Sequence, residues 1–451
     1  MLVNIRNRLV SLSPAQMLAI FYFLAITVAV ILLSLPFVHK PDAEWTFLDA
    51  LFTAVSAVSV TGLTTVSIID TFTVPGIFIL MIVLQIGGIG IMTLGTLFWL
   101  VLGKKIGLRE RQLIMVDQNQ LNLSGIVNLM RQIMLMILII ELIGTIILGT
   151  YYLKYFPEWK EAYLHGMFSA ISATTNAGFD ISGSSLVPFA HDYFVQMVHI
   201  ILMTLGAIGF PVLIETKNFI LTIGTKRTYR FSLYTKLTTV TFFALVVIGT
   251  ILIYLIESSN YLSDKSFLES FFYALFQSAT TRSTGLYTMD VSMFSETTLL
   301  IMSIFMFIGA SPSSVGGGVR TTTVAVILLV AFHFAKGSST VKVFKREIHP
   351  DDIKKSIAVM TVSVILCLTS IVILSATERF TLMEIIFEVC SAFGTTGLSL
   401  GITSELSPIG KIIIMIMMFI GRIGILSFIF LIGKQRKEAN YHYPKERVII
   451  G

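Results

Sequence analysis

The sequence predicts an all-α polytopic membrane protein, with four tandem repeats around one central pore. Apolar residues (Ala, Val, Ile, Leu, Met, Phe, Trp, Tyr and Cys) make up 55% of the 451 residues, and only 13% are charged, against about 25% in soluble globular proteins. Apolar runs of membrane-spanning length recur along the chain, and one short glycine motif returns at nearly constant intervals. This composition excludes a disordered chain, a nucleic-acid-binding domain and an ordinary cytosolic enzyme.

The first element is an apolar run that begins near the N-terminus. At about 24 residues it is too long for the core of a signal peptide, which has about 7–15, so we expect a retained transmembrane helix. About 20 apolar residues cross the hydrocarbon core of a bilayer. Three later runs have this length, and the four together are the predicted outer helices, at 15–38, 131–153, 235–256 and 355–376.

A short amphipathic segment and a hydroxyl-rich stretch that ends in glycine follow each outer helix. The four copies read FTAVSAVSVTGL at 52–63, FSAISATTNAGF at 168–179, LFQSATTRSTGL at 275–286 and FEVCSAFGTTGL at 387–398. Intervals of 116, 107 and 112 residues separate their glycines, Gly62, Gly178, Gly285 and Gly397. The amphipathic segments have helical periodicity but are too short to span a membrane. Each repeat is therefore predicted to contain an outer helix, a half-spanning helix, an irregular loop and an inner helix.

Inner helices are predicted at 74–102, 193–216, 295–335 and 408–433. Three of them share the pattern G-x-I-G, in QIGGIGIM at 85–92, TLGAIGFP at 204–211 and FIGRIGIL at 419–426. The third run is different, because it is 41 residues long and reads FIGASPSSVGGGVRTTT from Phe307. Pro312 removes a helical hydrogen bond and the consecutive glycines disfavour a helix. We therefore expect two half-helices joined by a loop at 310–319, which must line a water-filled cavity.

The basic residues are sorted along the chain, and they predict its topology. Twenty-three of them fall in the termini and in the stretches 104–131, 217–236 and 336–355 after the inner helices, and six fall on the opposite side. The positive-inside rule then places both termini in the cytoplasm. Three arginines remain at membrane depth or at its edge, where charge is rare and usually functional: Arg282, Arg320 and Arg422. The predicted organisation is repeats at 1–103, 131–216, 235–335 and 355–433, cytosolic linkers at 104–130, 217–234 and 336–354, and a cytosolic tail at 434–451.

The four loops have the composition of an ion filter. They contain small and hydroxyl residues and no carboxylate, so the expected ligands are backbone carbonyls, which replace an ion's hydration shell in potassium-channel filters. One such loop would more simply be a helix-packing position, but four in register favour a filter. The candidate filter residues are Val60, Thr61, Gly62, Asn176, Ala177, Gly178, Ser283, Thr284, Gly285, Thr395, Thr396 and Gly397.

A second level of the pathway is predicted below the filter. Alignment of the inner helices places Gly88, Ala207, Ala310 and Arg422 at equivalent positions. A guanidinium at this depth costs roughly 2.5–3.5 kcal/mol unless it is solvated or paired. Two compatible roles follow for Arg422: an electrostatic constriction, or bracing of the 310–319 loop by donation to its carbonyls. The candidate gate residues are Ala310, Ser311, Pro312, Ser313, Ser314, Val315, Gly316, Gly317, Gly318 and Arg422.

On these motifs, the chain resembles the Trk/Ktr/HKT superfamily of potassium transporters over nearly its whole length, and is most similar to the Ktr-type membrane subunits. The resemblance implies that the four motif glycines are the filter glycines, and that an intramembrane gating loop faces an arginine of the last inner helix. Glycine rather than serine at position 62 implies a preference for potassium over sodium. Arg282, three residues before Gly285, is expected to brace the filter loop from behind, because a cation facing the axis would repel the ion.

The resemblance also implies a function and partners. Potassium would enter across a bacterial plasma membrane through a multi-pass homodimer, driven by the membrane potential. The homodimer would dock on a cytosolic ring of nucleotide-binding regulatory subunits, so ATP or ADP would bind the partner only, and sodium stimulates some members. No organic cofactor is expected. The basic linkers would either bind such a ring or serve topology and lipid contact alone.

Two other functions are weaker on the same sequence. A sodium-coupled secondary transporter of another small solute would be built from inverted repeats, whereas these four repeats are parallel. A membrane enzyme would need a catalytic constellation at depth. Glu141 is the one carboxylate expected within the membrane away from its interfaces, and the sequence shows no partner for it. The two cysteines have no metal-binding spacing, and we predict that the chain is not an enzyme.

Overall fold

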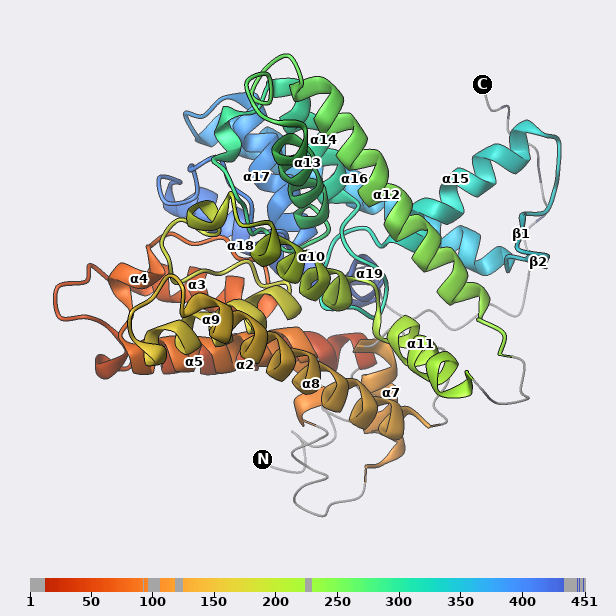
Figure 1. Cartoon of the computed structure of the whole chain (residues 1–451). Helices are drawn as coiled ribbons and strands as arrows, with labels where there is room; N and C mark the ends of the chain where they lie inside the picture. The colour runs from red at the N-terminus through yellow and green to blue at the C-terminus, as the bar shows by residue number, and fades with distance from the viewer. Residues whose placement is uncertain are drawn as a thin grey trace.

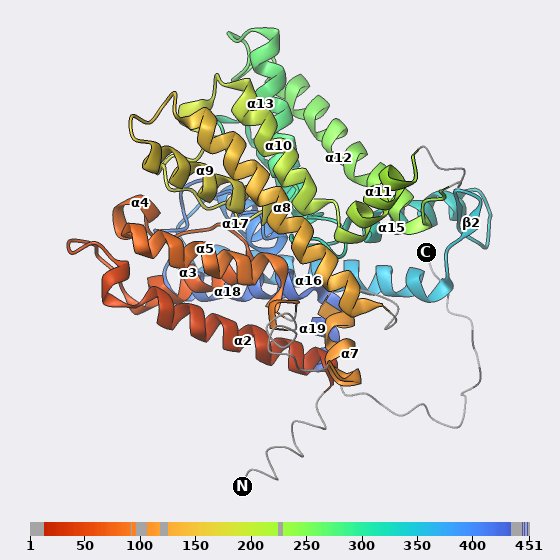
Figure 2. The same cartoon turned by 60° about the horizontal axis from the view of Figure 1, so that its bottom comes forward.

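The computed structural model describes residues 13–91, 93–95, 106–117, 125–223 and 229–433, together with 444, 446 and 449. Figures 1 and 2 show the helices in two regions. On the left of both views lie α3 (Phe47–Ser59), α4 (Ile68–Thr71) and α9 (Trp159–Thr174). On the right lie α11 (Phe210–Thr222), α15 (Thr321–Ala335) and the hairpin of β1 (Lys342–Val343) and β2 (Arg346–Glu347). The predicted N-terminal segment 1–12 and most of the predicted tail lie outside the described residues.

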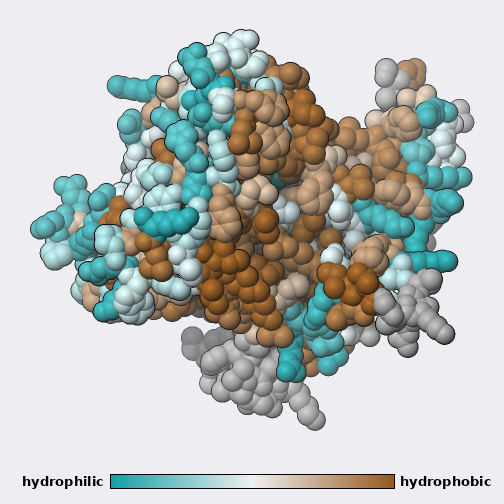
Figure 3. Space-filling view, in the orientation of Figure 1, coloured by the Kyte–Doolittle hydropathy of each residue, from teal (hydrophilic) through white to brown (hydrophobic). Residues whose placement is uncertain are grey.

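The outer helices are the longest elements of the fold. Their bounds are Pro14–Leu33 (α2), Ile126–Tyr152 (α8), Leu233–Glu257 (α12) and Pro350–Thr377 (α16). Each is long and apolar enough to cross a membrane. Large apolar side chains stay exposed on them, and on the face in Figure 3 they form a broad brown band between two hydrophilic edges. This is the pattern of a protein whose outer helices contact lipid.

Four half-length helices lie between the outer and inner helices of the repeats. They are α3 (Phe47–Ser59), α9 (Trp159–Thr174), α13 (Phe267–Thr280) and α17 (Leu382–Gly394). Hydroxyl N-caps start three of them, and at Thr46 and Thr381 the third helical residue completes a capping box. These caps satisfy amides that a helix terminus otherwise leaves free. The C-terminal halves are almost entirely buried, so these four helices end inside the protein.

The inner segments differ from the prediction, which broke only the third of them. The structure has α5 (Val74–Ile89), α10 (Tyr193–Ala207) with α11 (Phe210–Thr222), α14 (Glu296–Phe307) with α15 (Thr321–Ala335), and α18 (Pro408–Ile423) with α19 (Ile425–Ile432). The second glycine of each G-x-I-G pattern has a positive φ, at Gly90, Gly209 and Gly424. This conformation is open to glycine and ends a helix.

The breaks bend the chain sharply. The two pairs α10–α11 and α18–α19 turn by 106° and 104°. Among the described residues, four helices are individually long enough to span a membrane, and six spans result when each bent pair counts as one. The eight spans expected from the sequence are therefore not eight full-length helices.

Each inner helix is anchored at its start to the outer helix of its own repeat or to the turn after it, by the same chemistry in repeats 3 and 4 and by different chemistry in repeats 1 and 2. The carboxylate of Glu257 accepts hydrogen bonds from the N-cap Ser295, and that of Glu378 from the N-cap Ser407. In repeat 2 the hydroxyls of Tyr151 and Tyr155 donate to the N-cap Asp192, at 2.8 and 2.6 Å. In repeat 1 a backbone carbonyl after α2 accepts from the amide of the N-cap residue of α5. These anchors fix the outer end of every inner helix.

The predicted linkers contain ordered structure that the sequence did not indicate. Helix α7 (Leu108–Asp117) lies in the first linker. Strands β1 (Lys342–Val343) and β2 (Arg346–Glu347) form an antiparallel hairpin in the third. Its two turn residues both have positive φ, as a two-residue type I′ turn requires. The remaining short elements are α4 (Ile68–Thr71) and 3₁₀ turns at Pro36–Val38, Val187–Phe189 and Val291–Met293.

Candidate functional site

The four glycine loops share one backbone conformation. Two residues before each glycine, the chain adopts a positive φ of 47–80° in a residue that is not glycine: Val60, Asn176, Ser283 and Thr395. The motif glycines themselves have φ between 68° and 94°. A positive φ is a genuine outlier for a β-branched residue and costs about 1–3 kcal/mol. The same strained geometry in four loops marks them as copies of one structural element.

The four loops close into a ring. A methyl group built on Gly62 would come 2.5 Å from the carbonyl oxygen of Ala177 in the next loop. The same overlap follows around the ring, from Gly178 to the Thr284 carbonyl, from Gly285 to that of Thr396, and from Gly397 back to that of Thr61. The structure thus brings together the candidate filter residues of all four repeats. None of the four motif glycines has room for a side chain.

Hydroxyl groups at the ends of the half-length helices hold the loops. Ser56 and Ser391 accept hydrogen bonds from the amides of their motif glycines, both at 3.1 Å. Ser172 and Thr280 instead donate to the carbonyl of the residue after the glycine, both at 2.6 Å. A hydroxyl six residues before the glycine, present in three of the four copies, is a signal that the sequence analysis missed. In the third copy Ala279 has that position and its neighbour Thr280 supplies the hydroxyl.

The half-length helices also carry charge to the ring. They end at Ser59, Thr174, Thr280 and Gly394, each within five residues of a motif glycine. A helix C-terminus carries the equivalent of about half a negative elementary charge. Four such ends converge on one ring of carbonyls. The arrangement attracts a cation without placing a carboxylate in the loops.

Arg282 lies behind the third loop and is 1% exposed. Its guanidinium donates to the carbonyl of Phe305 on α14, and lies 5.1 Å from the centre of that residue's ring. The side chain therefore contacts the inner helix of its own repeat.

A buried carboxylate also lies behind the ring, and the sequence analysis missed it. Glu388 on α17 is 1% exposed and accepts hydrogen bonds from the hydroxyls of Ser399, at 2.8 Å, and Thr403, at 2.5 Å. Glu141 is therefore not the only carboxylate in the interior of the bundle. The hydroxyl donors of Glu388 come from the segment just after the fourth filter loop, so the carboxylate ties that segment to the helix before the filter.

The predicted gate loop lies directly beneath the ring. The amide of Gly317 donates to the hydroxyls of Thr395, at 2.7 Å, and Ser283, at 3.2 Å. These two residues begin the filter triplets of repeats 4 and 3. A methyl group on Gly317 would come 2.6 Å from the Thr395 side chain, so the close approach requires glycine here. The gate loop and the filter are in direct contact.

The gate loop also contacts the other three inner helices at their G-x-I-G patterns. Ser311 and Val315 donate from their amides to the carbonyls of Ala207, at 3.1 Å, and Gly206, at 3.2 Å. The amide of Gly318 donates to Gly421 at 3.3 Å. In repeat 1, a methyl group built on Gly88 would be 3.4 Å from the Val315 side chain. The loop therefore fills the space that the three broken inner helices enclose.

Arg320 and Arg422 both lie at the level of the gate loop. The bracing of this loop that the sequence suggested for Arg422 is made by Arg320. Arg422 is buried and donates to the carbonyls of Gly87 and Gly88, and no described hydrogen bond joins it to the gate loop. Arg320 donates to the loop carbonyls of Gly316 and, at 3.4 Å, Ser311. Bracing of the loop through its carbonyls thus belongs to Arg320, because Arg320 begins α15 at the end of the loop itself. The hydroxyl of Tyr234 on α12 adds a 2.5 Å bond to Pro312.

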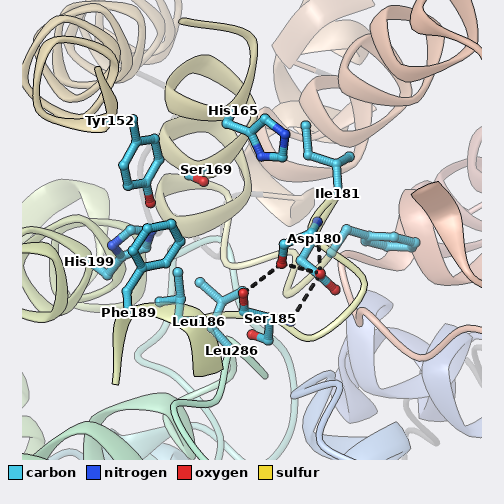
Figure 4. Close-up of a pocket in the computed structure, with 12 residues that line it drawn as sticks. Tyr152, His165, Ser169, Asp180, Ile181, Ser185, Leu186, Phe189, His199 and Leu286 are labelled. Atoms are coloured by element: carbon cyan, nitrogen blue, oxygen red, sulfur yellow. Dashed lines mark hydrogen bonds between the residues drawn. The ribbon is translucent and has the colours of Figure 1, made fainter. Parts of the chain in front are cut away.

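Two small cavities lie near the ring and the predicted gate loop. One lies below the gate loop and is lined by both arginines, Tyr22, Asp117 and residues of the loop. The other lies beside the second filter loop (Figure 4), where Asp180 accepts hydrogen bonds from the amides of Ser182, Gly183 and Ser185. Nowhere in the described ranges do three His, Cys, Asp or Glu side chains converge as a metal site would require.

Comparison with known proteins gives consistent matches over almost the whole chain. A family model described as TrkH, cation transport protein, matches residues 14–442. The chain is 61% identical to Ktr system potassium uptake protein D of Bacillus subtilis (strain 168), over 98% of both chains. It is 37% identical to Ktr system potassium uptake protein B of the same organism, over 98% of both, and 34% identical to the potassium/sodium uptake protein NtpJ of Enterococcus hirae, over 99% of both.

A solved structure shares the fold. The potassium transporter TrkH from Vibrio parahaemolyticus superposes with a TM-score of 0.74 at 18% sequence identity, covering 94% of this chain and 86% of that one. At this identity the likeness concerns the fold alone. It confirms the all-α polytopic membrane architecture that the sequence predicted.

Proposed function

Because the chain belongs to the TrkH family of cation transport proteins, we propose that it is the membrane subunit of a potassium uptake system. It is a multi-pass membrane transporter and not an enzyme. The observation that carries the proposal is the closed ring, in which each motif glycine lies against the carbonyl that precedes the next. The inward driving force is the membrane potential, worth about 2.3 kcal/mol per elementary charge for each 100 mV.

The ring acts as the selectivity filter. Carbonyls of the four triplets replace the water that a potassium ion loses on entry, and the four helix ends stabilise the charge. Rigidity is needed for this exchange, and the absence of space around the motif glycines supplies it. Arg282 braces the third loop from behind, since its guanidinium donates to α14.

The loop at 310–319 acts as the gate. Its hydrogen bonds run to the filter and to two inner helices, and each is worth about 0.5–1.5 kcal/mol net. Water can replace these partners when the loop moves, so a modest input of free energy opens the path. Arg422 and Arg320 line the cavity below the loop and add an electrostatic barrier to cations while the loop is in place.

The regulatory assembly is part of the same proposal. The subunit forms a homodimer on a cytosolic nucleotide-binding ring, whose ATP or ADP binds outside this chain, and sodium activates uptake. Both termini then face the cytoplasm of a bacterial cell. The relatives named for a Ktr system and for potassium/sodium uptake support this assignment, as does the excess of basic residues in the linkers.

Rubidium uptake into liposomes tests the function. Purified protein is reconstituted, a potential is set with a potassium gradient, and entry of radioactive rubidium is followed with and without sodium, with lithium as competitor. We expect uptake that potassium competes for and that lithium does not. Equal competition by potassium, sodium and lithium would contradict a potassium filter. Rubidium entry that requires sodium together with another solute would favour the coupled transporter instead.

A further inference from the structure

Glu141 lies in the middle of α8, in a stretch that reads ILIIELIGTII, and is 5% exposed. Among the described residues, none of the ion pairs includes it. A charged side chain in the membrane interior is expensive and needs a partner. The potassium pathway described above does not use this residue, so its presence needs another explanation.

Within the described ranges, its one hydrogen-bond partner comes from another repeat. The side-chain nitrogen of Gln85 on α5 donates to Glu141 Oε2 at 2.5 Å. Two buried oxygens then remain without a hydrogen-bond partner in the described part of the chain: Glu141 Oε1 and Gln85 Oε1. If Glu141 were ionised, both would be acceptors with no donor. Such groups are rarely left unsatisfied in a protein interior.

A single proton satisfies both oxygens. We propose that Glu141 is protonated and forms a cyclic acid–amide pair with Gln85. In this pair Glu141 Oε1 carries the proton and donates to Gln85 Oε1, while the Gln85 nitrogen donates to Glu141 Oε2. A protonated carboxyl has one donor and an amide has both donor and acceptor, so the two groups match. The proton comes from water, and the pair is neutral.

The other buried carboxylates differ in the donors they receive. Glu388 accepts a hydroxyl on each oxygen, and Glu257 accepts the hydroxyls of Ser295 and Thr298. These groups are satisfied as carboxylates. Of the three, Glu141 alone faces a side-chain amide, whose oxygen is a second acceptor beside the carboxyl group. The inference therefore concerns one carboxyl and not buried acids in general.

The proton lies at a junction between repeats. Gln85 is on the inner helix of repeat 1, two residues before Gly87, whose carbonyl accepts from Arg422. Glu141 is on the outer helix of repeat 2. The acid–amide pair thus holds α5 against α8 close to the gate level, and Glu141 is a positioning residue.

Infrared difference spectroscopy tests the protonation directly. Wild-type protein in liposomes at neutral pH is compared with Glu141→Gln. The difference spectrum is expected to contain the carbonyl stretch of a protonated carboxylic acid that only the wild type has. Glu378→Gln is the matched control, because the half-exposed Glu378 accepts from the amide and hydroxyl of Ser407 and its loss removes carboxylate bands.

Thermal unfolding supplies a second measurement. Glu141→Gln keeps a neutral paired amide, so we expect its melting temperature within about 2 °C of wild type. Glu141→Leu and Gln85→Leu each leave the other side chain without its hydrogen-bond partner, so each should lower the melting temperature further. The double variant leaves neither group unpaired and should recover part of that loss. Loss of carboxylate bands in Glu141→Gln, or a band that appears only with sodium present, would overturn the proposal in favour of an ionised group or a bound cation. Additive losses in the two leucine variants would also contradict it.

Discussion

The proposed filter ring and the proposed gate level beneath it come from the same four repeats, yet they differ in symmetry. At the ring, all four loops share one strained backbone, and each glycine lies against the next loop. At the gate level, three inner helices break at a glycine, and the third repeat inserts a loop among them. A coordination ring needs four equivalent contributions. A gate needs one element that can move while the others stay in place.

The two regions also differ in what holds them. Besides the hydroxyl hydrogen bonds behind its loops, the ring is fixed by exclusion, since no atom can be added at its glycines without overlap. The gate loop is fixed by individual hydrogen bonds to the filter, to Gly206, Ala207 and Gly421, and to Arg320. Exclusion gives rigidity, whereas hydrogen bonds can be exchanged for water at small net cost. Substitutions should therefore abolish the function of the ring but adjust that of the gate.

The largest effect is expected at the ring. Gly397→Ala forces a side chain into a left-handed conformation, with φ +94°, and against the carbonyl of Thr61. We expect displacement of that carbonyl to raise the transport barrier by at least about 1.4 kcal/mol, which is a loss of rubidium uptake of at least about tenfold. The control is Gly401→Ala, which has the same backbone strain at φ +93° with nothing within 4 Å. Equal losses in the two variants would show that strain, and not ring closure, controls transport.

Deletion of Ser311–Gly318 tests the gate. Removing the segment opens the space below the filter, and we expect rubidium flux to rise by about tenfold and to lose its regulation. Because Gly317 also contacts Thr395 and Ser283, we expect some loss of potassium preference as well. Flux is measured in liposomes with protein whose thermal unfolding remains cooperative. Unchanged flux in such protein would refute a plugging role.

Gly62→Ser separates selectivity from conduction. Its φ of +93° and the nearby Ala177 carbonyl force the ring to widen around a serine, and a wider ring coordinates potassium less well than a filter of equal loops. The potassium-to-sodium permeability ratio is expected to fall by about tenfold, about 1.4 kcal/mol of discrimination, as measured from reversal potentials. A ratio equal to wild type would count against the filter assignment of this loop.

Arg320→Gln and Arg422→Gln sharpen the division of roles at the gate. Both remove one positive charge from the same cavity, but among the described hydrogen bonds those to the gate-loop carbonyls come from Arg320 and not from Arg422. We expect flux to rise more in Arg320→Gln, by roughly three- to tenfold, since hydrogen bonds from charged groups are worth about 1.5–3 kcal/mol. Flux assays on both variants give the comparison. A larger rise in Arg422→Gln would assign the barrier to charge and not to loop bracing.

Sequence alone predicts the features that repeat. The four filter loops follow from glycines at regular intervals, and the gate loop from Pro312 within a run too long for one span. The breaks at Gly90, Gly209 and Gly424 were not predicted, because each glycine weakens a helix by only about 1 kcal/mol and glycine is common in transmembrane helices. Pro211, two residues after Gly209, was a further signal of a break that the sequence analysis missed. A break there depends on tertiary contacts, among them those with the gate loop.

Contacts between residues distant in the sequence could not be predicted either. Arg320 and Arg422 are both marked by their depth, but only the fold decides which of them meets the gate loop. Gln85 lies 56 residues from Glu141, and no spacing rule connects them. The β1–β2 hairpin was missed because its turn, Phe344 and Lys345, lacks the asparagine and glycine that usually accept positive φ. In each case a contact between elements overrides a local preference.

The smallest effect on transport is expected at Asp192, which contacts neither the ring nor the gate loop in the described hydrogen bonds. Burial works to raise the pKa of Asp192, but hydrogen bonds from Tyr155, Tyr151 and two backbone amides hold it below its usual value. A depressed pKa gives stability that is present above the unfolded value and is lost as the pH falls through the folded one, so the wild type should lose this contribution below about pH 4. Asp192→Asn keeps an N-cap but removes the charge.

Its melting temperature should therefore be about 1–3 °C lower at neutral pH, and the gap to wild type should close in acid. Selectivity should not change in Asp192→Asn, because Asp192 anchors only the outer end of α10, whereas the ring and the gate contact the other end. Flux could still change slightly, since α10 carries the Gly206 and Ala207 carbonyls that hold the gate loop. A change in selectivity without a change in flux would show that the filter depends on the outer anchors. The separation between a rigid ring and an adjustable gate would then fail.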